Sequence, residues 1–316
     1  MENLSSMKNV CLKKKCSQNF FINGKKLVKL HAKATTWYNV SEEIDMEKGK
    51  IRKLKKELPD ELLQIEDFFI KDAEENDLKH FEIYKQLESS INGKYVCSDL
   101  FKETFPLYTK SLESRKKLSE VIHNSAACLA GEYFDILAKD KSVDKCIFLS
   151  GVPGAGKSYF IQSIALSGQL DDKTMIYEGD ITTETIYEKI DKCVENGKDI
   201  FFLIVNPTLE LAQRNAIARH FEIGRGASSE TMARIMSKIP GALENIMKKY
   251  DIELGIFDKH SNYDVYGTVG KESLDHLNHG TYEEILDKLL ALRLEILEEY
   301  KKKTSLGEEV EYGPKK

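Results

Sequence analysis

The chain has 316 residues, of which 41% are hydrophobic and 31% are charged, and it contains only 6 prolines and 19 glycines. This composition excludes a disordered, low-complexity or collagen-like chain and predicts a folded protein with a large core. The longest apolar run, residues 200–205, is far shorter than the roughly 20 residues that a membrane-spanning helix needs. Because no signal-peptide pattern follows the N-terminal lysines, we expect a cytoplasmic protein with no membrane partner.

The formal net charge of −5 is unevenly distributed, because residues 1–33 contain eight lysines and a single acidic residue, Glu2. A basic arm of this kind can touch nucleic acid or an acidic partner, but most such arms are only solvated. We therefore assign it no function and do not expect nucleic acid as a partner. The six cysteines have neither disulfide-framework nor zinc spacing, so we expect free thiols.

Residues 1–93 are predicted to form an accessory region. Asn23-Gly24 lies between two short apolar runs and predicts a hairpin turn, since both residues tolerate positive φ. The segment 44–88 is rich in Glu, Lys and Leu and predicts one or two amphipathic helices, interrupted before Pro59.

Residues 94–145 are predicted to be a helical lead-in to the main domain. Ser98 and Asp99 are suitable residues to cap a short helix that stops near Pro106. Apolar residues then recur at helical spacing from Leu118 to Leu137, which predicts a longer helix.

Residues 146–316 alternate between predicted strands and helices. The strands are expected at 146–150, 174–178, 199–205 and 253–257, and the helices at 157–167, 182–196, 209–250 and 281–303. Strands that alternate with helices favour a parallel sheet covered on both faces. The predicted fold class is therefore α/β with three layers.

A phosphate-binding loop follows the first of these strands. The segment matches the pattern G-x-x-x-x-G-K-[ST] at every fixed position, with Gly151, Val152, Pro153, Gly154, Ala155, Gly156, Lys157 and Ser158. Its glycines let backbone N–H groups surround phosphate oxygens, and the following helix adds its positive N-terminal end. Lys157 is expected to reach the β- and γ-phosphates of ATP, and Ser158 to bind Mg²⁺.

Two carboxylates, Glu178 and Asp180, emerge where the next strand ends. One of them is expected to hold Mg²⁺ while the other accepts the proton of an acceptor hydroxyl. We predict Glu178 for the metal and Asp180 for the proton, and Asp180 is also suited to cap the helix that follows. The third strand ends in Asn206-Pro207 instead of the metal-binding Asp of many ATPases, which makes a motor-type ATPase a poor fit.

Arg219 and Arg225 follow, the second between Gly224 and Gly226. Arginine forks bind phosphate through two hydrogen bonds, so we predict that these two residues belong to a lid that closes over the transferring phosphoryl group. Arg214 is expected to be a solvated helix residue.

Together these residues resemble the zeta-toxin family of P-loop kinases, over roughly 98–262. The matching features are GVPGAGKS, a strand ending in Glu178-Gly179, the strand FFLIV before Asn206-Pro207, Arg219 with Arg225, and a later strand ending in Phe257-Asp258. The segment from Ser98 to Tyr108 also resembles the one that precedes the P-loop in a divergent branch of the family.

The resemblance implies an ATP-dependent small-molecule kinase that acts as a toxin or as an effector delivered to a target cell. Zeta toxins phosphorylate a sugar hydroxyl of UDP-N-acetylglucosamine and are restrained by an antitoxin, so an inhibitor protein is an expected partner. By the same resemblance Lys157 and Ser158 bind nucleotide and metal, Glu178 is the acid of the Glu-Gly strand, and Arg219 and Arg225 contact phosphate.

The chain departs from the family between the P-loop helix and the Glu-Gly strand. Typical members carry their general-base Asp there in a long insertion, whereas only a few residues separate Ser167 from Thr174. Either Asp180 or Glu178 replaces that base, or the acceptor differs; nucleotides, dinucleotides such as NAD and nucleotide-sugars stay open. The alternatives are a nucleotide-binding interaction module without turnover and a kinase of nucleic-acid 5′ ends.

Overall fold

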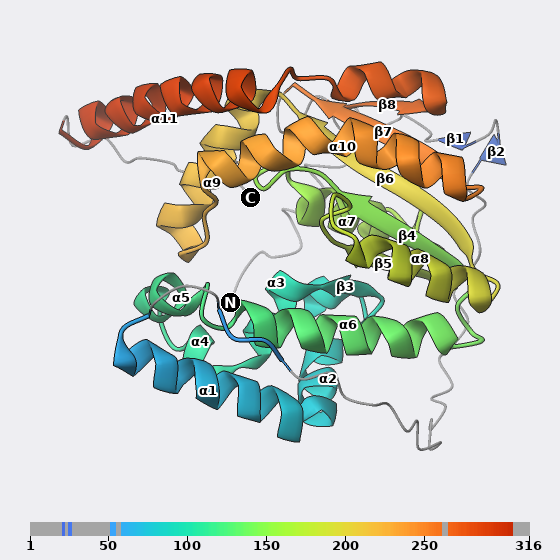
Figure 1. Cartoon of the computed structure of the whole chain (residues 1–316), viewed down its shortest axis with the longest axis horizontal. Coiled ribbons are helices and arrows are strands. Elements are labelled where there is room, and N and C mark those ends of the chain that lie inside the picture. The colour runs from blue at the N-terminus through green and yellow to red at the C-terminus, as the bar shows by residue number, and fades with distance from the viewer. Residues whose placement is uncertain (1–20, 23–24, 27–50, 55–57, 261–264, 306–316) are drawn as a thin grey trace, which may run out of the picture.

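The computed structural model describes residues 21–22, 25–26, 51–54, 58–260 and 265–305. These residues form a six-stranded sheet with helices on both faces (Figure 1). The chain is a three-layer α/β protein, as the sequence predicts.

The sheet has the strand order β3-β5-β4-β6-β7-β8. In that order the strands are β3 (Tyr95–Cys97), β5 (Thr174–Glu178), β4 (Lys145–Ser150), β6 (Asp199–Pro207), β7 (Glu253–Lys259) and β8 (Val265–Val269). Neighbouring strands are parallel except for β8, which is antiparallel to β7. The carboxyl ends of five strands therefore lie at one edge of the sheet, where open α/β sheets bind their ligands.

The helices occur in the predicted order, but the stretch 209–250 contains two helices separated by residues 224–228, and the segment 98–118 contains several short helices instead of one. They are α1 (Asp60–Glu75), α2 (Asp77–Gln86), α3 (Ser98–Phe101), α4 (Pro106–Thr109), α5 (Leu112–Leu118), α6 (His123–Lys139), α7 (Lys157–Leu166), α8 (Thr185–Glu195), α9 (Leu209–Ile223), α10 (Ser229–Lys249) and α11 (Tyr282–Ser305). Three short 3₁₀ helices are η2 (Glu88–Ser90), η3 (Lys102–Thr104) and η4 (Lys271–Leu277). Among the described residues, no helix is long and apolar enough to cross a membrane.

The two faces of the sheet are covered by different helices. Phe148 of β4 packs against Phe134 of α6, and the ring of Phe160 of α7 lies 4.6 Å from that of Phe257 on β7. Phe148 and Phe257 point to opposite faces, because Phe148 pairs with Phe202 of β6 whereas Phe257 pairs with Val205. Helix α7 and the loop before it therefore lie on the face opposite α6.

Strand β3 is a finding that the predicted lead-in did not include. It pairs with β5 in parallel, with Tyr95 opposite Ile176 and Cys97 opposite Glu178. The hydroxyl of Tyr84, on α2, donates to Tyr95 O and accepts from Cys97 N, so it covers the outer edge of this short strand. The lead-in thus supplies the first strand of the sheet, and its carboxyl end lies beside that of β5.

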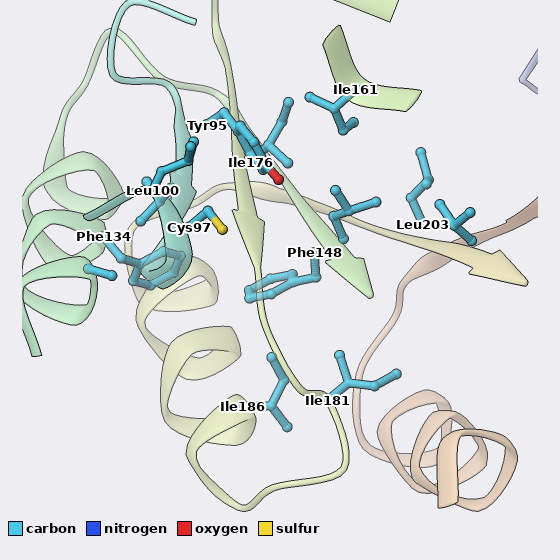
Figure 2. Packing of buried hydrophobic residues seen from close by; sticks show 14 of the residues in the cluster. Tyr95, Cys97, Leu100, Phe134, Phe148, Ile161, Ile176, Ile181, Ile186 and Leu203 are labelled. Atoms are coloured by element: carbon cyan, nitrogen blue, oxygen red, sulfur yellow. The ribbon is translucent and has the colours of Figure 1, made fainter. Parts of the chain in front are cut away.

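The core runs without a break from the N-terminal helices into the sheet. Helix α6 contacts α1, α2 and α3 as well as β3 and α8, and it lies between the N-terminal helices and the sheet (Figure 1). Figure 2 shows residues of this core on both faces of the sheet, with Tyr95 and Ile176 on one face and Phe134 and Phe148 on the other. The division of the chain into an accessory region, residues 1–93, and a lead-in that starts at residue 94 stays a prediction.

A separate antiparallel pair, β1 (Phe21–Ile22) with β2 (Lys25–Lys26), confirms the predicted hairpin, whose turn residues Asn23 and Gly24 lie outside the described part. The basic arm of residues 1–33 otherwise also lies outside it. The four cysteines within the described part, Cys97, Cys128, Cys146 and Cys193, have free thiols, as expected.

Candidate functional site

The predicted phosphate-binding loop, 151–158, connects β4 to α7 at the carboxyl edge of the sheet. Gly151 has φ +139°, and a Cβ there would lie 2.3 Å from Val205 O; Gly154 has φ +86°, and a Cβ there would lie 2.3 Å from Ala212 O. Neither position tolerates a side chain. Asn215 of α9 also donates Nδ2 to Gly154 O at 2.9 Å. The loop is therefore fixed in shape by β6 and α9 before any ligand binds.

Helix α7 begins at Lys157, directly after this loop. Its first backbone N–H groups have no partner within the helix, which makes this end attractive to phosphate oxygens. The ammonium of Lys157 donates to Gly151 O at 2.9 Å and to Val152 O at 3.2 Å, so the side chain folds back over the loop. This is the position from which a lysine reaches the phosphates of a bound nucleotide.

Glu178 lies beside Lys157 and Ser158, as predicted. Its Oε1 is 3.5 Å from Lys157 Nζ, and its Oε2 accepts a hydrogen bond from the Tyr95 hydroxyl. The same hydroxyl lies 3.2 Å from Ser158 Oγ. Tyr95 is fully buried, and burial with the neighbouring Glu178 charge raises its pKa well above the usual value, so it stays protonated. Four residues from β3, β5 and α7 thus form one polar cluster.

This cluster offers the ligands that Mg²⁺ prefers. Mg²⁺ in phosphate sites is held by one or two carboxylate or hydroxyl oxygens together with substrate phosphates and water. Ser158 Oγ and a Glu178 carboxylate oxygen meet at the Tyr95 hydroxyl, so the donor set fits the ion. The described residues contain no group of three or more His, Cys, Asp and Glu that suits a metal held by protein alone.

Asp180 has both carboxylate oxygens occupied. Its Oδ1 accepts from Thr182 N at 2.9 Å and from Thr182 Oγ1 at 2.6 Å, and its Oδ2 accepts from Arg234 of α10 at 3.0 Å. Burial alone would raise the pKa of Asp180, but the Thr182 hydrogen bonds and the Arg234 charge outweigh it and lower the pKa. Asp180 therefore closes a local turn with Thr182 and does not cap the following helix as predicted, because α8 begins at Thr185 with Glu184 at its N-cap. Its base role stays a prediction.

The two predicted lid arginines converge on Asp99, directly after β3. Arg225 donates to Asp99 O at 3.0 Å, and its NH1 lies 3.9 Å from a Glu103 carboxylate oxygen. Arg219 NH2 lies 3.9 Å from Asp99 Oδ2. Arg225 is largely buried, and its Nε has no hydrogen-bond partner within the part of the chain that is described. The C-terminal part of α9, with Arg219, and the loop after it, with Arg225, thus bring both arginines to the end of β3.

Asp99 is a site residue that the sequence presented only as a helix cap. Its carboxylate pairs with Lys102 at 2.9 Å, and its side chain keeps 41% of its surface exposed. Burial opposes its charge, but Lys102, Arg225 and Arg219 together hold the pKa of Asp99 well below its usual range. Asp99 is therefore an ionised and accessible carboxylate beside two arginines.

Asn206, at the end of β6, has a different task from the metal-binding Asp of many ATPases. Its Nδ2 donates to Asp258 Oδ1 at 2.7 Å and to His276 O at 3.0 Å, and its Oδ1 lies 2.7 Å from His279 Nε2. Asp258 also contacts His276 Nδ1 at 2.8 Å. This network joins β6 and β7 to the segment after β8, and Asn206 is fully engaged in it.

A cleft of about 760 Å³ borders the loop that carries Arg225. Gly224 and Gly226, the two neighbours of Arg225, lie in its wall, together with Lys116, Lys117 and Arg293. Its volume falls within the range of pockets that hold small organic ligands.

No protein-family model matches the chain, and no curated protein matches it either. Among solved structures, the complex AvrRxo1-ORF1:AvrRxo1-ORF2 with sulphate ions is similar, at 10% identity and a TM-score of 0.34. The similarity covers 67% of this chain and 71% of that chain. A likeness of this size assigns no activity, so the function is inferred from the site itself.

Proposed function

We propose that the chain is an ATP-dependent kinase of the zeta-toxin type, which transfers the γ-phosphoryl group to a hydroxyl of a nucleotide, dinucleotide or nucleotide-sugar. The observation that carries this proposal is the cluster of Lys157, Ser158, Glu178 and Tyr95 at the mouth of the phosphate-binding loop. A glycine turn with no ligand to bind would not require a carboxylate and a tyrosine hydroxyl in contact with its Lys and Ser side chains.

The loop and helix α7 bind the triphosphate of ATP in this proposal. Lys157 leaves its contacts with Gly151 O and Val152 O and donates to the β- and γ-phosphate oxygens. Ser158 and Glu178 hold Mg²⁺, which neutralises charge on the phosphates when it is bound. The Tyr95 hydroxyl keeps the Glu178 carboxylate in place beside Ser158.

The transfer is an in-line displacement at the γ-phosphorus. The acceptor oxygen forms a bond to phosphorus, the bond from phosphorus to the β–γ bridging oxygen breaks, and ADP leaves with the electron pair. The acceptor hydroxyl loses its proton to a carboxylate. Arg219 and Arg225 stabilise the charge on the transferring oxygens, and the unpaired Nε of Arg225 leaves a donor for this task.

Asp99 fits the role of proton acceptor better than Asp180. Both oxygens of Asp180 already accept hydrogen bonds from Thr182 and Arg234, and its side chain is 25% exposed. Asp99 pairs with Lys102 through Oδ1, but its side chain is 41% exposed and lies beside the two arginines. A carboxylate that orients the acceptor hydroxyl is sufficient here, because phosphoryl transfer depends mostly on positioning and charge stabilisation.

The acceptor belongs to the nucleotide class in this proposal. The cleft lined by Gly224 and Gly226 is large enough for such a molecule. Its wall carries Lys116, Lys117 and Arg293 next to Glu120 and Glu230, and phosphate groups would bind the three cationic side chains. A toxin or effector role under the control of an inhibitor protein rests on the family resemblance alone and is part of the same proposal.

The test is a transfer assay with γ-labelled ATP and Mg²⁺. The purified chain is incubated with UDP-sugars, NAD, nucleosides or oligonucleotides, next to Lys157→Ala and a control, Lys248→Ala, whose side chain is exposed on α10. We expect label on a nucleotide-type acceptor with wild type and Lys248→Ala but not with Lys157→Ala. Label on oligonucleotide 5′ ends would move the acceptor class to nucleic acid. Tight ATP binding without turnover, or hydrolysis that ignores every acceptor, would contradict the kinase.

A further inference from the structure

A second lysine lies against the phosphate-binding loop, opposite the Glu178 cluster. Lys259 is the last residue of β7, and its side chain is only 3% exposed. It shares a sheet face with Phe257, whose ring packs on Phe160 of α7. Lys259 therefore points into the layer that contains α7, on the side of β6 and β7, whereas Tyr95 and Glu178 approach from β3 and β5.

The ammonium of Lys259 reaches the residue that precedes Lys157. A Cβ built on Gly156 would lie 2.7 Å from Lys259 Nζ, closer than such contacts allow. Gly156 also has φ +81°, and it is the residue from which α7 starts. The positive φ favours glycine at this position, and the Lys259 ammonium lies in the space where a side chain would begin.

Nothing in the described part of the chain neutralises this ammonium. Neither a hydrogen bond nor an ion pair joins the Lys259 side chain to another described residue, although its main-chain O accepts from Thr208 N at 3.0 Å. Burial lowers the pKa of Lys259, and no carboxylate among the described residues offsets this effect. A buried cation beside a helix N-terminus is unfavourable in a protein without an anion, because both carry positive charge.

We propose that Lys259 is a second phosphate-binding residue of this loop, whose ammonium contacts the polyphosphate chain of the nucleotide from the β7 side. This inference rests on the proposed nucleotide site and adds a residue to it. Two lysines would then hold the triphosphate between them, Lys157 from the start of α7 and Lys259 from the neighbouring strand. Among the described residues no side chain compensates the buried charge, and the bound polyphosphate would do so.

The test compares Lys259→Met, which keeps the length of the side chain without its charge, with Lys259→Arg and Lys157→Ala. Binding of Mg²⁺-ATP, inorganic tripolyphosphate and adenosine is measured at equilibrium, and thermal unfolding is followed with and without ATP. We expect Lys259→Met to weaken ATP and tripolyphosphate by about 10- to 100-fold, as for a lost hydrogen bond to a charged group. Adenosine binding is expected not to change.

Thermal unfolding separates this role from a structural one. Removal of an uncompensated buried charge is expected to leave the melting temperature without ATP equal or higher in Lys259→Met, while the shift on adding ATP shrinks. Lys259→Arg, which keeps the charge, is expected to recover part of the ATP affinity.

Three outcomes would overturn the inference. If Lys259→Met binds ATP as wild type does while Lys157→Ala does not, the nucleotide site stands and Lys259 has no part in it. If Lys259→Met only melts earlier, with its ATP affinity unchanged, the residue is structural. If wild type binds neither ATP nor tripolyphosphate, both the proposed function and this inference are wrong.

Discussion

The two sides of the candidate site are built in different ways. The phosphate side comes mainly from one continuous segment, 151–158, which turns from β4 into α7. The acceptor side joins Asp99 after β3 with Arg219 and Arg225 around the end of α9, residues that are far apart in the chain. The geometry of the phosphate side therefore follows from the backbone conformation of one short segment, whereas the geometry of the acceptor side depends on which strands are neighbours in the sheet.

The largest effect on this comparison is expected from Asp99→Asn. If Asp99 accepts the proton, the substitution should lower kcat by about 10²- to 10⁴-fold, while the affinity for ATP changes little. Asp180→Asn is the matched control and should keep most of its activity. The measurement is steady-state transfer at saturating ATP. Loss of kcat in Asp180→Asn with an active Asp99→Asn would return the base to Asp180.

Arg225→Met is expected to lower kcat by roughly 10²-fold, because a donor aimed at developing charge in the transition state is lost. Arg214→Met is the control, since Arg214 pairs with Glu210 and Glu299 instead of the site. Binding of ATP should be retained in both variants. Equal activity of the two variants would show that Arg225 does not stabilise the transition state.

Tyr95→Phe is expected to weaken activity by about 10-fold and to raise the Mg²⁺ concentration that activity needs, because Glu178 loses its hydrogen bond. Tyr177→Phe is the control, because Tyr177 points to the opposite face of β5. The measurement is a Mg²⁺ titration of the transfer rate. An unchanged Mg²⁺ requirement would mean that Tyr95 only packs in the core.

Asp180→Asn gives the smallest expected effect, and it concerns stability. The pKa of Asp180 is lowered in the folded protein, so its stabilising contribution is fully present above the unfolded value of about 3.9 and is lost as the pH falls through the lower folded value. We expect the variant to cost about 1–2 kcal/mol of unfolding free energy at pH 7, and less below pH 4.

Denaturant unfolding at several pH values checks this, with Asp251→Asn, at an exposed position, as the control. A cost that does not shrink in acid would show that the Asp180–Arg234 pair is not its source.

The fold class and the phosphate side could be predicted from the sequence because both depend on patterns within short, continuous segments. A buried strand, eight loop residues and a helix follow each other directly, and the alternation of strands and helices continues to β7. Glu178 was found for the same reason, since it ends a strand with a clear apolar pattern. The glycine contacts with Val205 and Ala212 then fix the loop that the motif predicts.

The acceptor side was harder to predict because it depends on β3. Three residues in a helical context, Tyr95 to Cys97, give no periodic signal, and each pairs with a residue of β5 that lies 81 positions further along the chain. Without that pairing, Asp99 is only a helix cap and Tyr95 only a buried aromatic residue. The role of Lys259 was missed for a related reason. A single lysine at a strand end predicts no site until the structure shows that its ammonium lies beside Gly156.

The central claim is that the loop from Gly151 to Ser158 holds the triphosphate of ATP with Lys157 and Glu178 around it. Calorimetric titration of Mg²⁺-ATP into wild type and into Lys157→Ala tests it most directly. We expect saturable heat with wild type, and in the variant either no heat or an affinity lower by about 100-fold or more. No heat with wild type, or the same heat in Lys157→Ala, would contradict it.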